Sequence, residues 1–340
     1  MTAVAKRQDV RRSARGPQVL RSPAARLVAK RLLLMFPIML GVSILTFWVL
    51  DLIPGSAAQQ LLGEEATPEQ VRQLEQELGL DKPAVERYLS WLGGVLQGDL
   101  GRSSISGQPV SAQVGERLGV TIELAVLSFA WALVLAVAVA LLSARKPNGL
   151  FDRLSMLVSV MGLSVANYVL ALMLVLVFAV QIPLFPAIGF VPLGDGIGAN
   201  LHSVALPCLA MGAHLFCYYT RFLRGDLVDQ MQSQDYVITA RAKGVHPWKV
   251  LTRHAFRNSS YGLIAVVGLH AGSMIGATVI VEQIFALPGL GQLLLQAINA
   301  RDAVVVQAIV LLFAVSAVLA NLAADLLHAV LDPRIRHGSS

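Results

Sequence analysis

Hydrophobic residues gather along this chain into six long runs, separated by shorter polar stretches. A helix rises about 1.5 Å per residue, so each run is long enough to cross ~30 Å of hydrocarbon. The pattern therefore predicts an all-α membrane protein with six transmembrane helices. The runs are Leu32–Ile53, Leu118–Ser143, Leu154–Val180, Ser203–Phe222, Ser259–Val281 and Ala303–Val330.

The first run could also be read as a signal peptide, because Ser56-Ala57-Ala58 could serve as a cleavage site. A signal core has only about 7–15 apolar residues, and this run is longer. We therefore expect a retained transmembrane helix over residues 30–53. Residues 1–29 form a basic tail without an apolar period, which indicates disorder.

Residues 54–117 are polar and predict a small helical subdomain between the first two spans. Thr67-Pro68-Glu69-Gln70 has the spacing of a capping box, with proline at the first helical position. This helix should stop at Gly79, and a second helix should start near Pro83. A glycine-bracketed loop follows, and it contains Gly98, Asp99, Gly101 and Arg102.

A second polar stretch, Asp235–Asn258, interrupts the apolar pattern between the fourth and fifth runs. It predicts two short helices broken at Gly244–Pro247, because glycine ends a helix and proline suits the first turn of the next. Its first half combines apolar and small residues, a pattern that favours insertion into a groove on a partner. Its second half has basic residues at spacing four, which are also typical of charge facing lipid phosphates: Lys249, Arg253 and Arg257.

Charge distribution orients the chain. Of its 27 Lys and Arg residues, 21 fall in residues 1–31, 144–153, 221–258 and 332–340. Basic residues favour the cytoplasmic side, so both termini and the stretch Asp235–Asn258 are predicted to be cytoplasmic, with residues 54–117 outside. This placement explains the high isoelectric point without nucleic acid. The full expected order is a basic tail (1–29), the first span (30–53), the outer subdomain (54–117), a core with five spans and the cytoplasmic loop 223–258 (118–331), and a short tail (332–340).

The sequence carries no motif for an enzyme active site. It has no nucleotide-binding loop of the G-x-x-x-x-G-K-[ST] kind, no H-E-x-x-H, no Cys-x-x-Cys and no Gly-x-Ser-x-Gly. Cys208 and Cys217 fall on opposite sides of one helix, which disfavours a disulfide between them and indicates packing. We expect neither a metal nor a cofactor in this chain.

Ionisable and small residues inside the spans are further candidates. His214 and His270 either line a wet cavity or bond a neighbouring helix. The glycines Gly268, Gly272 and Gly276 lie on one helix face and either pack within one subunit or approach a second subunit around a pathway. Four others lie near span ends, where interfacial placement explains them: Asp51, Glu282, Asp325 and His328.

These motifs together resemble a known family. Asp235-Tyr236-Val237 with Thr239–Gly244 resembles the coupling loop of bacterial ABC-importer permeases, and more closely the B-type permease subunit of the dipeptide/oligopeptide (peptide/nickel) importers. The ordered set covers about residues 30–336. Its other segments are Leu78–Pro83, Gly98–Ser103 with Pro109-Val110, Glu282–Phe285, Pro288–Gly291, Ala300–Asp302 and Leu331–Arg336.

Three features depart from the family pattern. Pro54-Gly55-Ser56-Ala57 replaces the family's frequent Pro-Gly-Asp-Pro. Tyr261-Gly262 stands where Ile/Leu-Pro commonly follows the coupling loop, which bears on the geometry of entry into the fifth span. Residues 1–29 have no counterpart in the pattern.

The resemblance implies a type I ABC-importer permease fold in the bacterial inner membrane. It also implies a heterodimer with a second homologous permease, two cytoplasmic ABC ATPases that carry ATP and magnesium, and a periplasmic or lipid-anchored solute-binding protein. A coupling helix at about Gln234–Lys243 would dock on an ATPase. The coupling residues it implies are Asp235, Tyr236, Thr239, Ala240, Arg241, Ala242, Lys243 and Gly244.

The solutes implied are dipeptides and oligopeptides, with nickel chelates, glutathione or opines as alternatives. Two other classes stay open from the residues alone. An ion-coupled secondary transporter would need ion-coupling residues or broken helices at mid-membrane, and neither is evident. A membrane scaffold without transport is the other.

Overall fold

The computed structural model describes residue 33 and residues 36–48, 57–63, 66–77 and 79–331. Nearly all of this part is helical, and it contains no strand beyond an isolated bridge between Arg102 and Pro109. The basic tail, the short C-terminal tail, and the ends of the first predicted span lie outside the described residues. The helices in order are α2 (Ala57–Leu62), α3 (Pro68–Glu77), α4 (Ala84–Leu96), α5 (Val110–Arg145), α6 (Leu150–Ser164), α7 (Asn167–Val175), α8 (Ile197–Ser233), α9 (Asp235–Ala242), α10 (Pro247–Lys249), α11 (Phe256–Ile284), α12 (Leu290–Asn299) and α13 (Ala303–Leu331).

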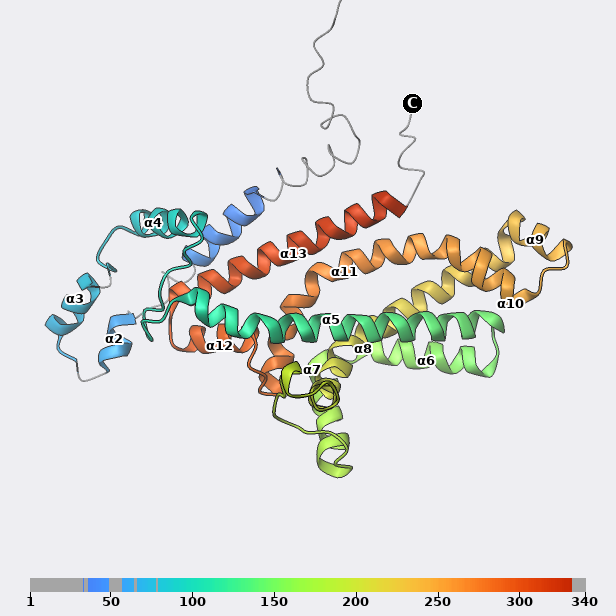
Figure 1. Ribbon diagram of the computed structural model, residues 1–340, viewed down its shortest axis with the longest axis horizontal. Helices are drawn as coiled ribbons and strands as arrows, with labels where there is room; N and C mark the ends of the chain where they lie inside the picture. The colour runs from blue at the N-terminus through green and yellow to red at the C-terminus, as the bar shows by residue number, and fades with distance from the viewer. Residues whose placement is uncertain (1–32, 34–35, 49–56, 64–65, 78, 332–340) are drawn as a thin grey trace, which may run out of the picture.

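Two closely packed helix pairs, α5 with α8 and α11 with α13, make up most of the bundle (Figure 1). Small residues at every fourth position of α5 are buried against the core and allow the neighbouring backbones to come close. They are Ala132, Ala136, Ala140 and Ala144. Trp131 beside them donates its indole N–H to the Cys208 carbonyl on α8 at 2.7 Å. Both Cys208 and Cys217 are buried free thiols, as expected of packing residues.

Among the described residues, four helical segments are long and apolar enough to cross a membrane: α5, α8, the continuous run Pro247–Ile284, and Ala303–Ala324 of α13. A bent pair, α6 with the segment from Asn167 to Gln181, gives a fifth if it counts as one span. The first predicted span is described only as a shorter apolar helix, Phe36–Trp48.

The predicted span Leu154–Val180 is not one helix, which corrects the expectation from its apolar length. It bends by 106° at Val165 and Ala166, which are extended, and it ends in a π-helical turn, Leu176–Gln181. The Ser164 hydroxyl donates to the Val160 carbonyl at 3.0 Å, a bond that competes with the helix ladder at this point. No proline marks the bend, and the two polar residues beside it, Ser164 and Asn167, are too few to interrupt the apolar run.

The other core helices are longer than the apolar segments that predicted them. α5 starts eight residues before Leu118, and α8 extends from Ile197 to Ser233 around Ser203–Phe222. Consequently, the predicted loop 223–258 contains the last turns of α8 and the first residues of α11. The polar part is thereby reduced to α9, α10 and the turn between them.

The helices before α5 follow the signals in their sequence. The Thr67 N–H donates to Gln70 Oε1 at 2.9 Å and the Gln70 N–H donates to Thr67 Oγ1 at 3.4 Å, which is the reciprocal capping box. α3 ends at Glu77, and Gly79 takes a φ of 67°. Helix 36–48 packs on α4, where Tyr88 bonds to Ser43 at 2.8 Å.

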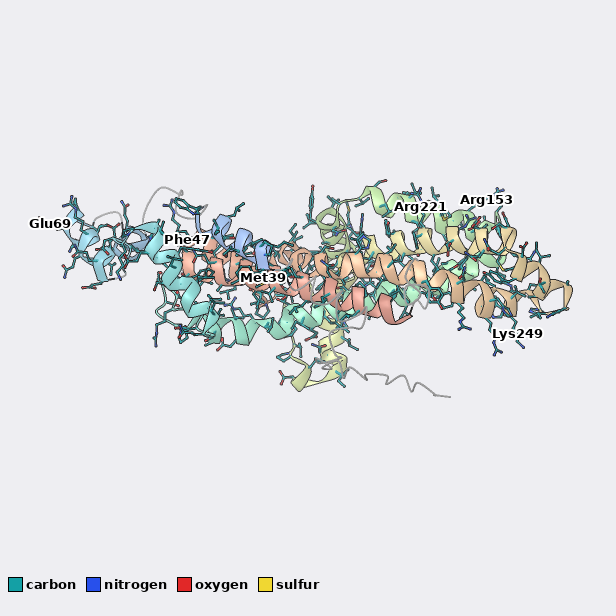
Figure 2. The ribbon with its side chains drawn as sticks, turned by 90° about the horizontal axis from the view of Figure 1, so that it is seen from above. Met39, Phe47, Glu69, Arg153, Arg221 and Lys249 are labelled. Carbon is teal, nitrogen blue, oxygen red and sulfur yellow. The ribbon has the colours of Figure 1, made fainter. Side chains whose placement is uncertain are left out.

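The two polar regions lie at opposite ends of the molecule. α3, α4 and α12 gather at the end where α5 and α13 begin, whereas α9 and α10 lie at the end where α5 and α8 finish (Figure 1). Figure 2 shows Glu69 of α3 at one extreme, and Arg153, Arg221 and Lys249 toward the other.

Candidate functional site

The polar helix pair, defined here as α9, the turn 243–246 and α10, is a folded element with well-defined ends. At the end of α9 the Gly244 N–H donates to the Arg241 carbonyl at 2.9 Å, and the Val245 N–H donates to the Ala240 carbonyl at 3.2 Å. Gly244 has a φ of 78°. These two bonds and the left-handed glycine form a Schellman motif, so the break expected from Gly244 is present.

α10 starts as the sequence predicts and then merges with α11. Pro247 occupies the first helical turn, and the His246 side chain accepts the Trp248 N–H at 3.3 Å. A π-helical segment, Val250–Ala255, joins α10 to α11. The helical run therefore continues from Pro247 to Ile284, and a displacement of α10 bears directly on a candidate span.

α9 has an inner and an outer face. Val237 (0% exposed) and Ala240 (8% exposed) pack against Val250, with Met231 and Val245 beside them. Ala240 is thus part of the packing within this chain, although its small size suggested a contact with a partner. The other residues expected to couple lie on the exposed side: Asp235, Tyr236, Thr239, Arg241, Ala242, Lys243 and Gly244.

Ile238 is a surface residue that sequence reasoning missed. Its side chain is 57% exposed on the outer face of α9. The adjacent pair Val237-Ile238 was the available signal, because neighbouring residues on a helix face different sides and both cannot be buried on one face. The outer face therefore offers an apolar contact at Ile238 among the exposed charged residues Asp235, Arg241 and Lys243.

Tyr236 connects the polar helix pair to α8. Its hydroxyl donates to Gln230 Oε1 at 2.6 Å. Burial raises the pKa of the Tyr236 phenol above its ordinary value, and the nearby Asp226 charge acts in the same direction. The phenol therefore keeps its proton and remains a hydrogen-bond donor.

Two further contacts secure this end of the bundle. Arg224 of α8 makes a two-pronged bond to the buried Asp152 of α6, at 2.8 Å from Nε and 2.6 Å from Nη2. The Arg145 guanidinium at the end of α5 lies 5.8 Å from the centre of the Trp248 ring on α10. The α5–α6 turn is thereby attached both to α8 and to the polar helix pair.

At the opposite end, the glycine-bracketed loop is folded against the start of α13. The Gly101 N–H donates to Asp99 Oδ1 at 2.9 Å, and Gly98 and Gly101 take φ values of 84° and 85°. The Ser103 hydroxyl donates to the buried carboxylate of Asp302, and the Ser104 N–H donates to Asp302 Oδ1 at 3.3 Å. Two segments of the family pattern, far apart in sequence, therefore meet in space.

Comparison with known proteins decides the family. Residues 118–337 match the family described as "Binding-protein-dependent transport system inner membrane component", and residues 24–125 match its N-terminal region. The chain belongs to this family. It is therefore an inner-membrane permease component of a binding-protein-dependent ABC importer, a transport component rather than a catalytic enzyme.

Several relatives align over nearly their whole length. A putative peptide transport system permease protein of Brucella abortus is 40% identical over 311 residues, which cover 92% of this chain and 99% of that protein. A glutathione transport system permease protein of Pectobacterium atrosepticum is 38% identical over 308 residues, covering 91% and 98%. The glutathione transport system permease protein of Escherichia coli is 35% identical over 310 residues, covering 91% and 98%.

Glu282 of this permease is fully buried inside the protein near the end of α11. Its carboxylate has no exposed surface and accepts the Thr121 hydroxyl of α5 at 2.8 Å and the Gln292 N–H of α12 at 3.0 Å. The Leu290 N–H in turn donates to Thr121 Oγ1 at 2.8 Å. The side chain thus caps the N-terminus of α12 and joins it to α5 and α11. The side chains of Asp51, Asp325 and His328 lie outside the described residues.

The glycine stripe of α11 faces two environments. A Cβ added at Gly268 would meet Ala324 of α13, and one added at Gly272 would lie 2.9 Å from the Ala317 carbonyl. A Cβ added at Gly276 would have no described atom of another element within 4 Å. Gly268 and Gly272 thus serve close packing inside this permease.

The two intramembrane histidines differ in their surroundings. His270 Nδ1 lies 3.0 Å from the Val266 carbonyl, and its ring lies 4.9 Å from Tyr218 and 5.6 Å from Tyr219 of α8. It therefore packs between α11 and α8. His214 is half-buried on α8.

Proposed function

We propose that this permease component forms half of the pathway of an ATP-driven importer for dipeptides and oligopeptides. The observation that carries the proposal is the polar helix pair: a short helix with an exposed outer face, joined without a break to a span-length helix. The peptide class rests on the relative from Brucella abortus, which is named a peptide transport permease and aligns over 99% of its length.

In this proposal the chain crosses the membrane six times. The first crossing is residues 30–53, and the bent pair α6–α7 counts as one crossing. The polar helix pair is cytoplasmic together with both termini, since basic residues cluster at that end, among them Arg153, Arg221 and Lys249 (Figure 2). Residues 54–117 then face the periplasm, where a soluble or lipid-anchored binding protein delivers the solute.

The partners in this proposal are a second homologous permease, which completes the pathway, and two cytoplasmic ABC ATPases, which hold ATP and magnesium. The outer face of α9 docks on one ATPase through Ile238, with Arg241 and Lys243 around it. Closure of the ATPases moves α9, and α10 passes that movement through Val250–Ala255 to α11. Nucleotide need only favour one permease state by a few kcal/mol to shift the population.

Glutathione is the second candidate solute, because relatives that are 38% and 35% identical are named glutathione transport permeases. Glutathione is itself a peptide, so both candidates share the chemistry of amide and carboxylate groups. An ion-coupled secondary transporter is disfavoured by the family match. The bend in α6–α7 is a broken helix of the kind such transporters use, but the family match outweighs it.

A transport assay in proteoliposomes tests this proposal. The complete complex and its binding protein would be supplied with a labelled dipeptide, with ATP on the ATPase side. We expect uptake that unlabelled oligopeptides reduce. Uptake reduced by glutathione alone would assign glutathione as the solute, and uptake reduced by neither would overturn a peptide solute.

A further inference from the structure

One side-chain oxygen joins three elements around the polar helix pair. Gln230 lies near the end of α8, and its Oε1 accepts the Tyr236 hydroxyl of α9 at 2.6 Å and the Asn258 amide of α11 at 2.8 Å. The three residues come from three separate helices, and Gln230 and Asn258 lie 28 positions apart. Gln230 is therefore a junction, and neither of its bonds is part of a helix ladder.

The junction spans two places where the chain can flex. Gln234 is the single residue between α8 and α9, and its extended backbone has φ −94° and ψ 128°. The bond from Tyr236 to Gln230 bridges that residue. Val250–Ala255 between α10 and α11 is π-helical, a form that often marks functional sites within helices. The bond from Asn258 to Gln230 reaches past that segment.

Apolar packing alone does not fix the orientation of α9. Val237 and Ala240 hold α9 against Val250 and Met231, but such contacts are non-directional. Hydrogen bonds require alignment of donor and acceptor, so they restrict rotation as well as distance. Because both bonds share one acceptor, a rotation of α9 pulls on Gln230 and, through it, on Asn258.

We propose that Gln230 is a positioning residue that makes α8 and α11 follow α9 when the ATPases move it. This inference rests on the proposed function of the polar helix pair. Gln230 does not form part of the docking face, since α9 presents that face through Ile238. Loss of the junction should therefore leave ATPase binding intact and reduce the solute imported per ATP hydrolysed.

The experiment uses the complete reconstituted complex and measures three quantities: ATPase co-purification, ATP hydrolysis and solute uptake. Gln230→Leu removes the acceptor, and Gln230→Glu keeps an acceptor oxygen at similar reach. Gln232→Leu, an exposed glutamine near the end of α8, is the matched control. Tyr236→Phe removes only one donor and leaves the ring in place.

We expect Gln230→Leu to lower the ratio of uptake to hydrolysis by at least about five-fold, because the loss of one ordinary hydrogen bond corresponds to about five-fold and this variant loses the acceptor of two. Co-purification should not change, Gln230→Glu should restore most of the ratio, and Gln232→Leu should match the wild type. Tyr236→Phe combined with Gln230→Leu should add little to Gln230→Leu alone, because the two residues share one bond.

An unchanged ratio in Gln230→Leu would overturn the inference, as would a loss of co-purification, which would place Gln230 in docking or folding. If the Gln230→Leu chain is not inserted into the membrane at all, Tyr236→Phe decides: a normal ratio contradicts the junction and a lowered ratio supports it. A wild-type complex without ATP-dependent uptake would instead refute the proposed function itself.

Discussion

Asp302 accepts a hydrogen bond from the Ser103 hydroxyl, although 199 residues separate the two in the chain. The same carboxylate accepts the Ser104 N–H at 3.3 Å and the Val305 N–H at 3.4 Å. Asp302 therefore caps the start of α13 and holds the loop after α4 at the same time. Through this contact, two segments of the family pattern that are distant in sequence lie next to each other in space.

Replacing Ser103 with Ala should destabilise the permease, because it removes a donor from a buried carboxylate. The expected loss is about 2 kcal/mol of unfolding free energy, the usual effect at a charged acceptor. Thermal unfolding of the purified chain in detergent measures it. Ser104→Ala is the control, since only its backbone N–H contacts Asp302. Equal stability of both variants would contradict the role of the Ser103 hydroxyl.

Glu282→Ala should lower the free energy of unfolding by about 3 kcal/mol, because two donors, the Thr121 hydroxyl and the Gln292 N–H, lose a buried acceptor. The first turn of α12 should also become less protected, which hydrogen exchange of its amides would detect. Gln292→Ala keeps the backbone donor and should retain wild-type protection. Normal exchange of α12 in Glu282→Ala would show that the carboxylate does not cap the helix.

Gly244→Val should uncouple transport while the chain still inserts into the membrane. Gly244 has a φ of 78°, and a residue other than glycine that adopts this angle loses about 1–2 kcal/mol of stability. A β-branched side chain such as valine is especially unfavourable there. An added Cβ meets no described residue within 4 Å, so the effect is one of backbone strain and not of collision.

Gly244→Asn is the matched comparison, because asparagine tolerates this conformation. ATP-driven uptake in vesicles should be lower for Gly244→Val than for Gly244→Asn. ATPase co-purification would be recorded for both variants. Normal uptake by Gly244→Val, with the ATPase still bound, would count against the turn as a coupling element.

Ile238→Asp should weaken ATPase binding at least tenfold, since burial of an isoleucine side chain contributes ~1.5–3 kcal/mol. Leu89→Asp provides a control of equal exposure, because Leu89 is 59% and Ile238 57% exposed, and Leu89 lies on α4 at the opposite end (Figure 1). Co-purification of the ATPase measures both. If Ile238→Asp retains the ATPase as well as Leu89→Asp does, the outer face of α9 is not the docking face.

Local signals in the sequence predicted local structure well. The glycine and proline at 244 and 247 marked the ends of two helices, and Thr67 and Gln70 form the expected capping box. These features depend on residues within one or two turns of each other. The alternation of apolar and polar segments is also read directly from the chain, and it predicted the span-length helices.

Contacts between distant elements could not be predicted in this way. Nothing near Glu282 in the sequence indicated Thr121, and nothing near Ser103 indicated Asp302. The faces of α9 were also undetermined, because eight residues make barely two turns, and small residues suit either an inner or an outer contact. The bend at Val165 was hidden because the apolar run continues through both halves.

The most direct test of the central claim is the energy source of uptake. Labelled dipeptide would be offered, with the binding protein, to proteoliposomes that contain this permease, its partner permease and the two ATPases. We predict uptake that requires ATP on the ATPase side and continues when a protonophore collapses the proton gradient. Uptake that follows the proton gradient and ignores ATP would contradict the assignment.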